Sequence, residues 1–304
     1  MSSAELEIVM LSLKVALWCV GLSLLPALLV AWLLARRDFY GKTLLNVLVH
    51  LPIVLPPVVV GYFLLVMLGN RGLIGGWLQD TFGLSLIFNW KGVVAATAVM
   101  AFPFIVRSIR QAIEAVDANL EVAALTLGRS PVMVFLTITL PLILPGILAG
   151  ATLGFARALG EFGATITFVA NIPGQTQTLP LAIYSLLQVP GGESAVWRLV
   201  ILSVLIAFGA IALSEWLSRR SAKLLEGLDI RLKKTLGGFH TSAEFKAEPG
   251  LTAVFGPSGA GKTMLAKMLA GLITPDEGRI EIDGRTLFDT AKGINLPVHQ
   301  RHVG

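Results

Sequence analysis

The sequence predicts an α-helical polytopic membrane protein followed by the beginning of an α/β domain. Three observations carry this prediction. The 304 residues are 55% hydrophobic and only 14% charged, whereas soluble domains carry about 25% charged residues. Apolar stretches long enough to cross a bilayer recur up to residue 217. After residue 217 charges become frequent and apolar runs become short, as expected for a soluble domain.

Five apolar stretches have about the 20 residues that a bilayer crossing needs, or nearly so. They are Val15–Leu34, Leu44–Leu68, Gly92–Ile109, Leu142–Leu159 and Val196–Leu217. Pro52, Pro56 and Pro57 interrupt the second stretch, so we expect it to be kinked or broken. The run Leu179–Val189 is too short to span, and re-enters the membrane or forms a partial sixth helix.

The basic residues predict the orientation, because Lys and Arg gather in cytoplasmic loops. With five crossings one side receives Arg36, Arg37, Lys42, Arg107, Arg110, Arg129, Arg219, Arg220 and Lys223. That side is the cytoplasm, which leaves the N-terminus outside and the C-terminus inside. A full sixth span would turn Arg219 and Arg220 outward, so we expect five.

The same clustering explains the net charge of +5 and the pI near 9.5 without a nucleic-acid partner. Cys19 is the single cysteine, which excludes an intrachain disulfide and a cysteine-rich metal site. The N-terminus is not a cleavable signal, because its apolar run is too long and its flank carries Glu5 and Glu7.

One segment of the membrane region, Leu120–Pro141, is amphipathic instead of uniformly apolar. Leu120, Ala123, Ala124 and Leu127 share one face of a predicted helix, and Gly128 suits its C-terminus. Such a helix can lie in the membrane interface, but interfacial helices are usually rich in Lys and Arg. Only Arg129 is basic here, which favours a protein partner.

This segment resembles the cytoplasmic loop of ABC importer permeases. The matching residues, at the family's spacing, are Glu121, Ala123, Ala124, Gly128, Ile138, Leu140 and Pro141. Val122 departs from the pattern, because the family usually has Glu there and this chain has its Glu at the preceding position. The resemblance implies the type I importer permease fold in a bacterial inner membrane, with a coupling loop that docks on an ATP-hydrolysing subunit.

A second resemblance extends over nearly all of residues 8–220. The run from Gly154 to Thr165, GFARALGEFGAT, resembles the permeases of molybdate importers, as do ITFVANIPG from Ile166 and TLPLAIY from Thr178. Sulfate permeases share part of it. The resemblance implies a homodimer of permeases, a separate ATPase subunit and a periplasmic or extracellular molybdate-binding protein. Molybdate and tungstate are nearly identical in size and charge, so both remain open, as does sulfate.

Arg157, Glu161 and Thr165 are the candidate residues of a translocation path. Charges at membrane depth usually face a cavity or one another, and the i, i+4 spacing of Arg157 and Glu161 permits an ion pair. The pair either lines the path or only neutralises itself. Neutral hydrogen-bonding groups follow at Thr165, Thr167, Asn171, Thr176 and Thr178, which either contact a passing oxyanion or cap turns.

The sequence divides into a permease domain over 1–220, a linker or helix tail to residue 228, and a second domain over 229–304. Strands are expected at Ile230–Leu232, Phe239–Phe245 and Leu251–Phe255. The phosphate-loop motif G-x-x-x-x-G-K-[ST] follows as Gly256, Pro257, Ser258, Gly259, Ala260, Gly261, Lys262 and Thr263, with a predicted helix after it. Backbone N–H groups and Lys262 would hold the phosphates of ATP, and Thr263 would hold Mg²⁺.

Residues after the loop, including Ala270-Gly271-Leu272 and Ile282-Asp283-Gly284, resemble the start of an ABC transporter ATPase. The residues after the motif include no acidic strand end, LSGGQ-like signature or glutamine loop, and we expect His299 and His302 to be solvent-exposed. Hydrolysis by this chain alone is therefore not expected. Residues 221–304 belong to a longer permease–ATPase fusion or are an inert tail that arose by frameshift or truncation.

The leading functional hypothesis is the membrane subunit of an ATP-driven oxyanion importer, for molybdate before sulfate or tungstate. The hypothesis from another class is a membrane-anchored nucleotide-binding protein, which the phosphate loop favours. Five spans and a docking loop argue against it, because an anchor needs only one span.

Overall fold

The computed structural model describes residues 2–126, 128–224, 227–247, 254, 256–257, 259–282 and 284–301. These residues form two compact units, one of Met1–Val116 with Ile143–Ser218 and one of Asp117–Leu142 with Arg219–Gly304. We describe each unit by itself.

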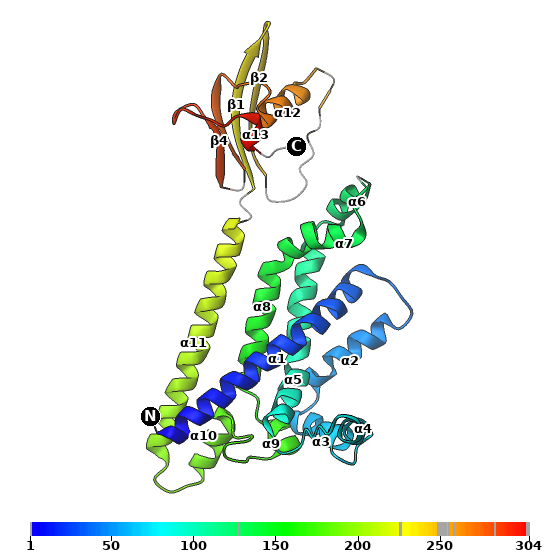
Figure 1. The fold of residues 1–304 in the computed structure, drawn as a ribbon, viewed down its shortest axis with the longest axis vertical. Helices are drawn as coiled ribbons and strands as arrows, with labels where there is room; N and C mark the ends of the chain where they lie inside the picture. The colour runs from blue at the N-terminus through cyan, green and yellow to red at the C-terminus, as the bar shows by residue number, and fades with distance from the viewer. Residues whose placement is uncertain are drawn as a thin grey trace. The chain divides into compact units, whose positions relative to one another are not determined.

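The first unit is helical (Figure 1). Its helices are α1 (Ser3–Arg36), α2 (Lys42–Val54), α3 (Pro57–Leu68), α4 (Leu73–Phe82), α5 (Trp90–Ala115), α8 (Leu140–Leu159), α9 (Gly163–Val169), α10 (Leu179–Leu187) and α11 (Glu193–Leu224). In the described part of the chain, four helical stretches are long and apolar enough to cross a membrane, and α2 with α3 makes a fifth if the bent pair counts as one span. The pair is bent by 116°. The five predicted stretches are therefore found, with the second broken at Pro56 as expected.

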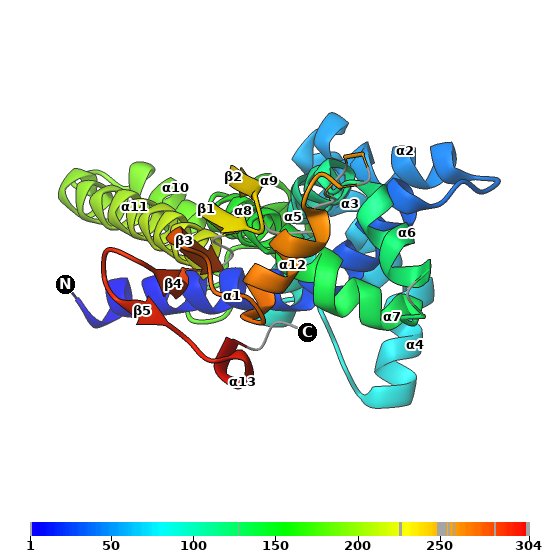
Figure 2. The same ribbon diagram turned by 90° about the horizontal axis from the view of Figure 1, so that it is seen from above.

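Small residues let α1 and α5 cross closely. Ala16 and Cys19 of α1 and Ala101 of α5 belong to one buried cluster, and each is fully buried. Figure 1 shows α1 running obliquely across α5, and in Figure 2 α1 is seen along its length. Because lipid supplies no hydrophobic drive between helices, such close packing is what holds a membrane bundle together.

α3 and α9 pack just as closely. A Cβ atom on Gly61 would lie 2.6 Å from the carbonyl oxygen of Ala164 and 2.9 Å from Cβ of Thr167. Phe168 of α9 continues into the buried cluster formed with Val60 and Val93. The short helix α9 is thereby held between α3 and α5.

Some elements were not predicted. The sequence gives no apolar run long enough to suggest α4 or α9, which have 10 and 7 residues. The fourth span begins at Pro131, well before the expected Leu142. α11 continues to Leu224, which confirms the helix-tail alternative for residues 218–224. α10 has nine residues, in keeping with the short run expected there.

The second unit contains α6 (Ala118–Thr126), α7 (Pro131–Val134) and a π-helical stretch, η1 (Phe135–Thr139). Its later part holds β1 (Leu228–Leu236), β2 (Phe239–Ala247), α12 (Lys262–Ala270), β3 (Glu277–Ile282), β4 (Arg285–Asp289), β5 (Ile294–Asn295) and α13 (Val298–Arg301). The strands form one antiparallel sheet in the order β2-β1-β3-β4-β5.

The two strands expected at Ile230 and Phe239 are confirmed as β1 and β2. Ile230 and Leu232 point to one side of the sheet, where they pack with Leu265 and Met268 of α12. The third expected strand, Leu251–Phe255, lies outside the described residues except for Val254, which is exposed. β3 and β4 pair as an antiparallel hairpin, and Gly284 lies between them with a left-handed φ of +72°.

Candidate functional site

The predicted coupling segment is a helix, a glycine turn and the start of the next helix. α6 ends at Thr126, and Gly128 adopts a left-handed φ of +84°. The backbone N–H groups of Gly128 and Arg129 donate to the carbonyl oxygens of Leu125 and Ala124, which closes the helix end. Ser130 then caps the new helix, which begins at Pro131.

Side chains of the motif tie the two helices of this segment together. Thr139 Oγ1, which is buried, donates a hydrogen bond of 2.7 Å to Glu121 Oε1. Ala124 is buried, and Ile138, Leu140 and Pro141 are half-buried. The side chains of Leu120, Ala123 and Leu127 lie outside what the structure describes. Val122, at the position where the resemblance expects Glu, is 55% exposed.

The chain turns sharply between α8 and α9, and a buried ion pair holds this elbow. Arg157 Nη2 lies 2.6 Å from Glu161 Oε2, in an ion pair that is not aligned as a hydrogen bond. The side chain of Glu161 is 1% exposed and that of Arg157 is 26% exposed. Glu161 Oε1 also accepts a hydrogen bond of 2.8 Å from the backbone N–H of Ala164, in the first turn of α9. The carboxylate therefore braces α9 as well as neutralising Arg157.

Three of the five neutral polar residues after the elbow are occupied by local hydrogen bonds. Thr167 Oγ1 donates to the carbonyl oxygen of Gly163, and Asn171 Nδ2 donates to Ser185 Oγ and to the carbonyl oxygen of Leu181. Thr176 Oγ1 accepts from the N–H of Ile172 and donates to the carbonyl oxygen of Ala170.

The hydroxyl groups of Thr165 and Thr178 differ from these three. Both are buried and have no hydrogen-bond partner within the described part of the chain. An unpaired buried hydroxyl costs free energy, which a passing polar ligand or water would recover. Thr165 and Thr178 are therefore the members of the group whose hydroxyl groups can still donate a hydrogen bond to a ligand.

Ala170 ends α9 in a strained conformation. Its φ of +60° and ψ of −171° fall in a region that only glycine occupies readily. The bond from Thr176 to its carbonyl oxygen helps to hold it there. The sequence carried no signal for this position, because alanine does not mark a turn.

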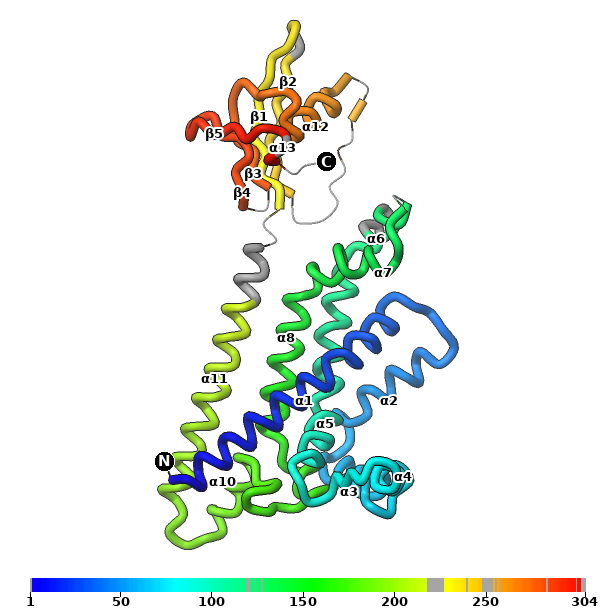
Figure 3. The backbone as a smooth tube through the Cα atoms, in the orientation of Figure 1, coloured from blue at the N-terminus to red at the C-terminus, as the bar shows by residue number. Residues whose placement is uncertain are grey.

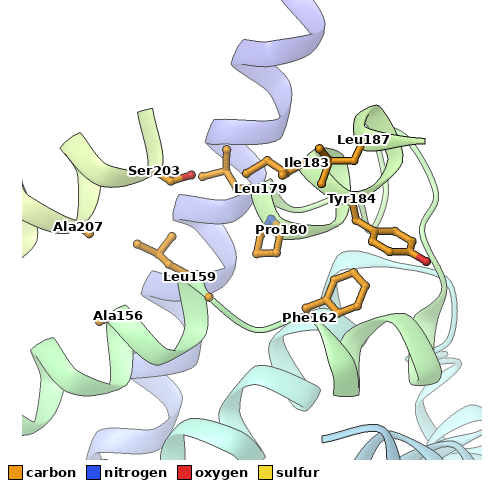
Figure 4. Close-up of a pocket in the computed structure, with 11 residues that line it drawn as sticks. Ala156, Leu159, Phe162, Leu179, Pro180, Ile183, Tyr184, Leu187, Ser203 and Ala207 are labelled. Carbon is orange, nitrogen blue, oxygen red and sulfur yellow. The ribbon is translucent and has the colours of Figure 1, made fainter. Parts of the chain in front are cut away.

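A cavity of about 510 Å³ lies beside the elbow, between the end of α8, α10 and α11 (Figure 4). Leu159, Phe162 and Tyr184 contribute to its lining, and the rings of Phe162 and Tyr184 are 5.0 Å apart. Its lining includes no charged side chain. The cavity is consequently unsuited to a doubly charged oxyanion.

The N-terminal part of α1 is joined to α10 and α11 by polar contacts that sequence reasoning missed. Figure 3 shows the N-terminus close to the start of α11. Glu5 Oε1 accepts from Arg198 Nε at 2.8 Å, and Ser12 Oγ accepts from the N–H of Leu179, the first residue of α10. Partners 193 and 167 residues apart in the chain leave no pattern that a single sequence can reveal.

The phosphate-loop residues are arranged as the motif requires where they are described. Gly259 and Gly261 both have φ of +86°, which residues with a Cβ atom rarely adopt. α12 begins at Lys262, whose Nζ donates to the carbonyl oxygens of Gly256 and Pro257. Thr263, Pro257 and Ala260 are exposed, and Ser258 lies outside the described residues. A free helix N-terminus, an exposed hydroxyl and a lysine held at the loop fit a bound phosphate.

Two family models match the chain. The model described as binding-protein-dependent transport system inner membrane component matches residues 27–223, and the model described as ABC transporter matches residues 241–304. The second match covers the phosphate loop and the sheet strands that follow it.

Characterised relatives are similar over the permease region. The molybdenum transport system permease proteins ModB of Haemophilus influenzae and Escherichia coli K12 are each 56% identical over 221 residues, which is 73% of this chain and 96% of theirs. The sulfate transport system permease protein CysT of Escherichia coli is 35% identical over 196 residues, 64% of this chain and 70% of its own.

Solved structures share the fold. A bacterial ABC transporter that imports alginate aligns with a TM-score of 0.57 at 19% identity, over 72% of this chain and 80% of that one. The MetNI methionine ABC transporter in an inward-facing conformation aligns with a TM-score of 0.55 at 14% identity, over 73% of this chain and 99% of that one. The helical fold, the matched model and the identity to ModB agree: this chain belongs to the family of binding-protein-dependent transport system inner membrane components.

Proposed function

We propose that this chain is the membrane permease of an ATP-driven importer for molybdate. The observation that carries the proposal is the difference in identity between relatives, 56% to the molybdenum permeases ModB against 35% to the sulfate permease CysT. The molybdenum relatives also match nearly to the ends of their own chains. Tungstate, which closely resembles molybdate in size and charge, is expected to compete.

Two copies of the permease would form the path between them, and a binding protein outside the cell would deliver the oxyanion. The N-terminus would lie outside and the C-terminus in the cytoplasm. The pattern of basic residues supports this orientation, with Arg36 and Arg37 at the end of α1. Thr165 is the path candidate with an unpaired hydroxyl, while Arg157 and Glu161 neutralise each other beside it.

Residues 256–263 would bind the phosphates of ATP. Lys262 would exchange the carbonyl oxygens that it now contacts for phosphate oxygens, and the exposed Thr263 hydroxyl would contact Mg²⁺. Bound nucleotide supplies the free energy that closes paired ATPase domains, and the segment from Glu121 to Pro141 would transmit that closure to the helices.

Uptake of labelled molybdate tests the proposal in cells that lack their own importer and express this chain with its binding protein and ATPase. We expect molybdate uptake that an excess of tungstate suppresses. The same concentration of sulfate should leave this uptake nearly unchanged. Stronger suppression by sulfate than by tungstate would assign the permease to sulfate instead. Absence of both molybdate uptake and sulfate uptake, in cells where the chain is present in the membrane, would reject the proposal.

A further inference from the structure

The helix α4 presents large apolar side chains to the outside of the first unit. Leu73 is 88% exposed, Trp77 is 57% exposed and Phe82 is 63% exposed. Such side chains are expensive to leave in water, because burying each one gains free energy. In Figure 1 α4 is seen nearly end-on while α5 runs up the picture, and in Figure 2 α4 is seen along its length. α4 therefore lies across the direction of the spans.

The two sides of α4 differ in polarity. At 100° per residue, Leu73, Ile74 and Trp77 fall within one arc of the helix and Gln79 falls opposite them. Asp80 lies beside Leu73, at the edge of the apolar face, where its carboxylate can reach the headgroups and water. Gly75 is buried, and a Cβ atom there would overlap the carbonyl oxygens at the end of α3. This close approach fixes the rotation of α4, so its apolar face is held outward.

Other residues mark the level of the membrane boundary at this end of the unit. Trp90 is the first residue of α5, and Lys14 Nζ lies 3.7 Å from the centre of its ring. The ring of Trp18 is 6.3 Å from that of Trp90. Tryptophan and lysine together are typical of the zone between lipid headgroups and acyl chains. Because α4 connects the end of α3 to this zone, it lies at the same depth.

We propose that α4 is an interfacial helix that binds the lipid surface. Leu73, Ile74 and Trp77 insert between the headgroups of the leaflet on the side of Trp90, and the exposed Arg71 contacts their phosphates. The apolar face, the orientation across the spans and the shared depth with Trp90 all fit a bilayer, whereas a protein partner would require only the first.

The anchor would act on α9 through α3. α4 packs on the end of α3, and α3 approaches α9 closely at Gly61. Lipid binding by α4 would thereby hold α3 at a fixed depth against α9. This inference depends on the membrane location of the chain and not on the identity of the transported oxyanion.

Fluorescence quenching of a probe on each face of α4 tests the inference. The full chain carrying Cys19→Ala receives Ile74→Cys, or Gln79→Cys as the matched control on the polar face. Each protein is labelled with bimane and reconstituted in nanodiscs of phosphatidylcholine and phosphatidylglycerol. We expect spin-labelled lipid to quench the probe at position 74 several-fold more than the probe at position 79, and aqueous iodide to show the reverse order.

Three outcomes would overturn the inference. Equal quenching of both positions by iodide would place the whole helix in water. Protection of position 74 from both quenchers would mean that protein covers it. Oxidative cross-linking of Ile74→Cys into a dimer would identify that protein as a second copy of the chain. If the variant at position 74 does not fold, Leu73→Cys samples the same face.

Discussion

The chain bends shortly before and directly after the helical stretch Pro131–Leu159, and the two bends are built differently. The first rests on Gly128, which is exposed, adopts φ of +84° and has open space where a side chain would lie. The second rests on Glu161, which is buried, pairs with Arg157 and accepts a hydrogen bond from α9.

The first bend is therefore built to move, and the second is built to stabilise the fold. A bend made by one backbone conformation in open space can change without disturbing neighbours. A bend made by a buried carboxylate is fixed, because any movement would leave a charge unpaired in the low-dielectric interior. We therefore expect changes at the second bend to affect folding, and changes at the first to affect transmission of the ATP-driven movement.

The largest loss of stability is expected for Glu161→Ala. It leaves Arg157 without its partner and the N–H of Ala164 without its acceptor. The loss in free energy of unfolding should be about 3 kcal/mol, since Arg157 retains some contact with solvent. Thermal unfolding of the purified protein in detergent measures it.

Glu161→Gln is the matched control. Its amide oxygen can still accept from Ala164, so it should recover part of the loss. Equal stability of Glu161→Ala and the parent protein would contradict the claim that the second bend is fixed by this carboxylate.

Gly61→Val should give the second-largest loss in the free energy of unfolding. Its side chain has no room against Ala164 and Thr167, so α3 and α9 must separate. We expect a loss of about 1–3 kcal/mol, typical of overpacking. The same substitution at Gly21, where a Cβ atom would meet nothing within 4 Å, is the control. Similar losses at both positions would show that close packing of α3 on α9 is unimportant.

Ala170→Gly should stabilise the protein. Glycine adopts φ of +60° with ψ of −171° without strain, so the change should gain about 1 kcal/mol after the extra chain entropy of glycine is subtracted. Ala170→Val should lower the melting temperature. A lower melting temperature for Ala170→Gly would mean that Ala170 is not strained.

The smallest effect concerns the second unit and depends on pH. Asp276 accepts hydrogen bonds from Lys234 Nζ and from the N–H of Thr235, which hold its pKa below 3.8. Its contribution to stability is therefore present above about pH 4 and is lost as the pH falls through the lower folded pKa. The parent protein should unfold at a higher temperature than Asp276→Asn at neutral pH, and the difference should vanish in acid. A difference that persists in acid would contradict this account.

Sequence patterns predicted the elements whose signals are local. Long apolar runs predicted the spans, Pro56 predicted the break between α2 and α3, and Gly128 predicted the end of α6. The contact of Ser12 with Leu179 and the unpaired hydroxyl of Thr165 depend on residues distant in sequence, or on burial. The amphipathic face of α4 was missed because the helix is too short for the length criterion of a span.

The most direct test of the account is the number of molybdate ions transported per ATP hydrolysed by the reconstituted transporter. Gly128→Val forces a branched side chain into a left-handed conformation, whereas Gly128→Asn tolerates that conformation. We predict that Gly128→Val hydrolyses ATP but transports far fewer ions per ATP, while Gly128→Asn keeps the parent ratio. An unchanged ratio in Gly128→Val would contradict the account, because the exposed bend would then play no part in coupling.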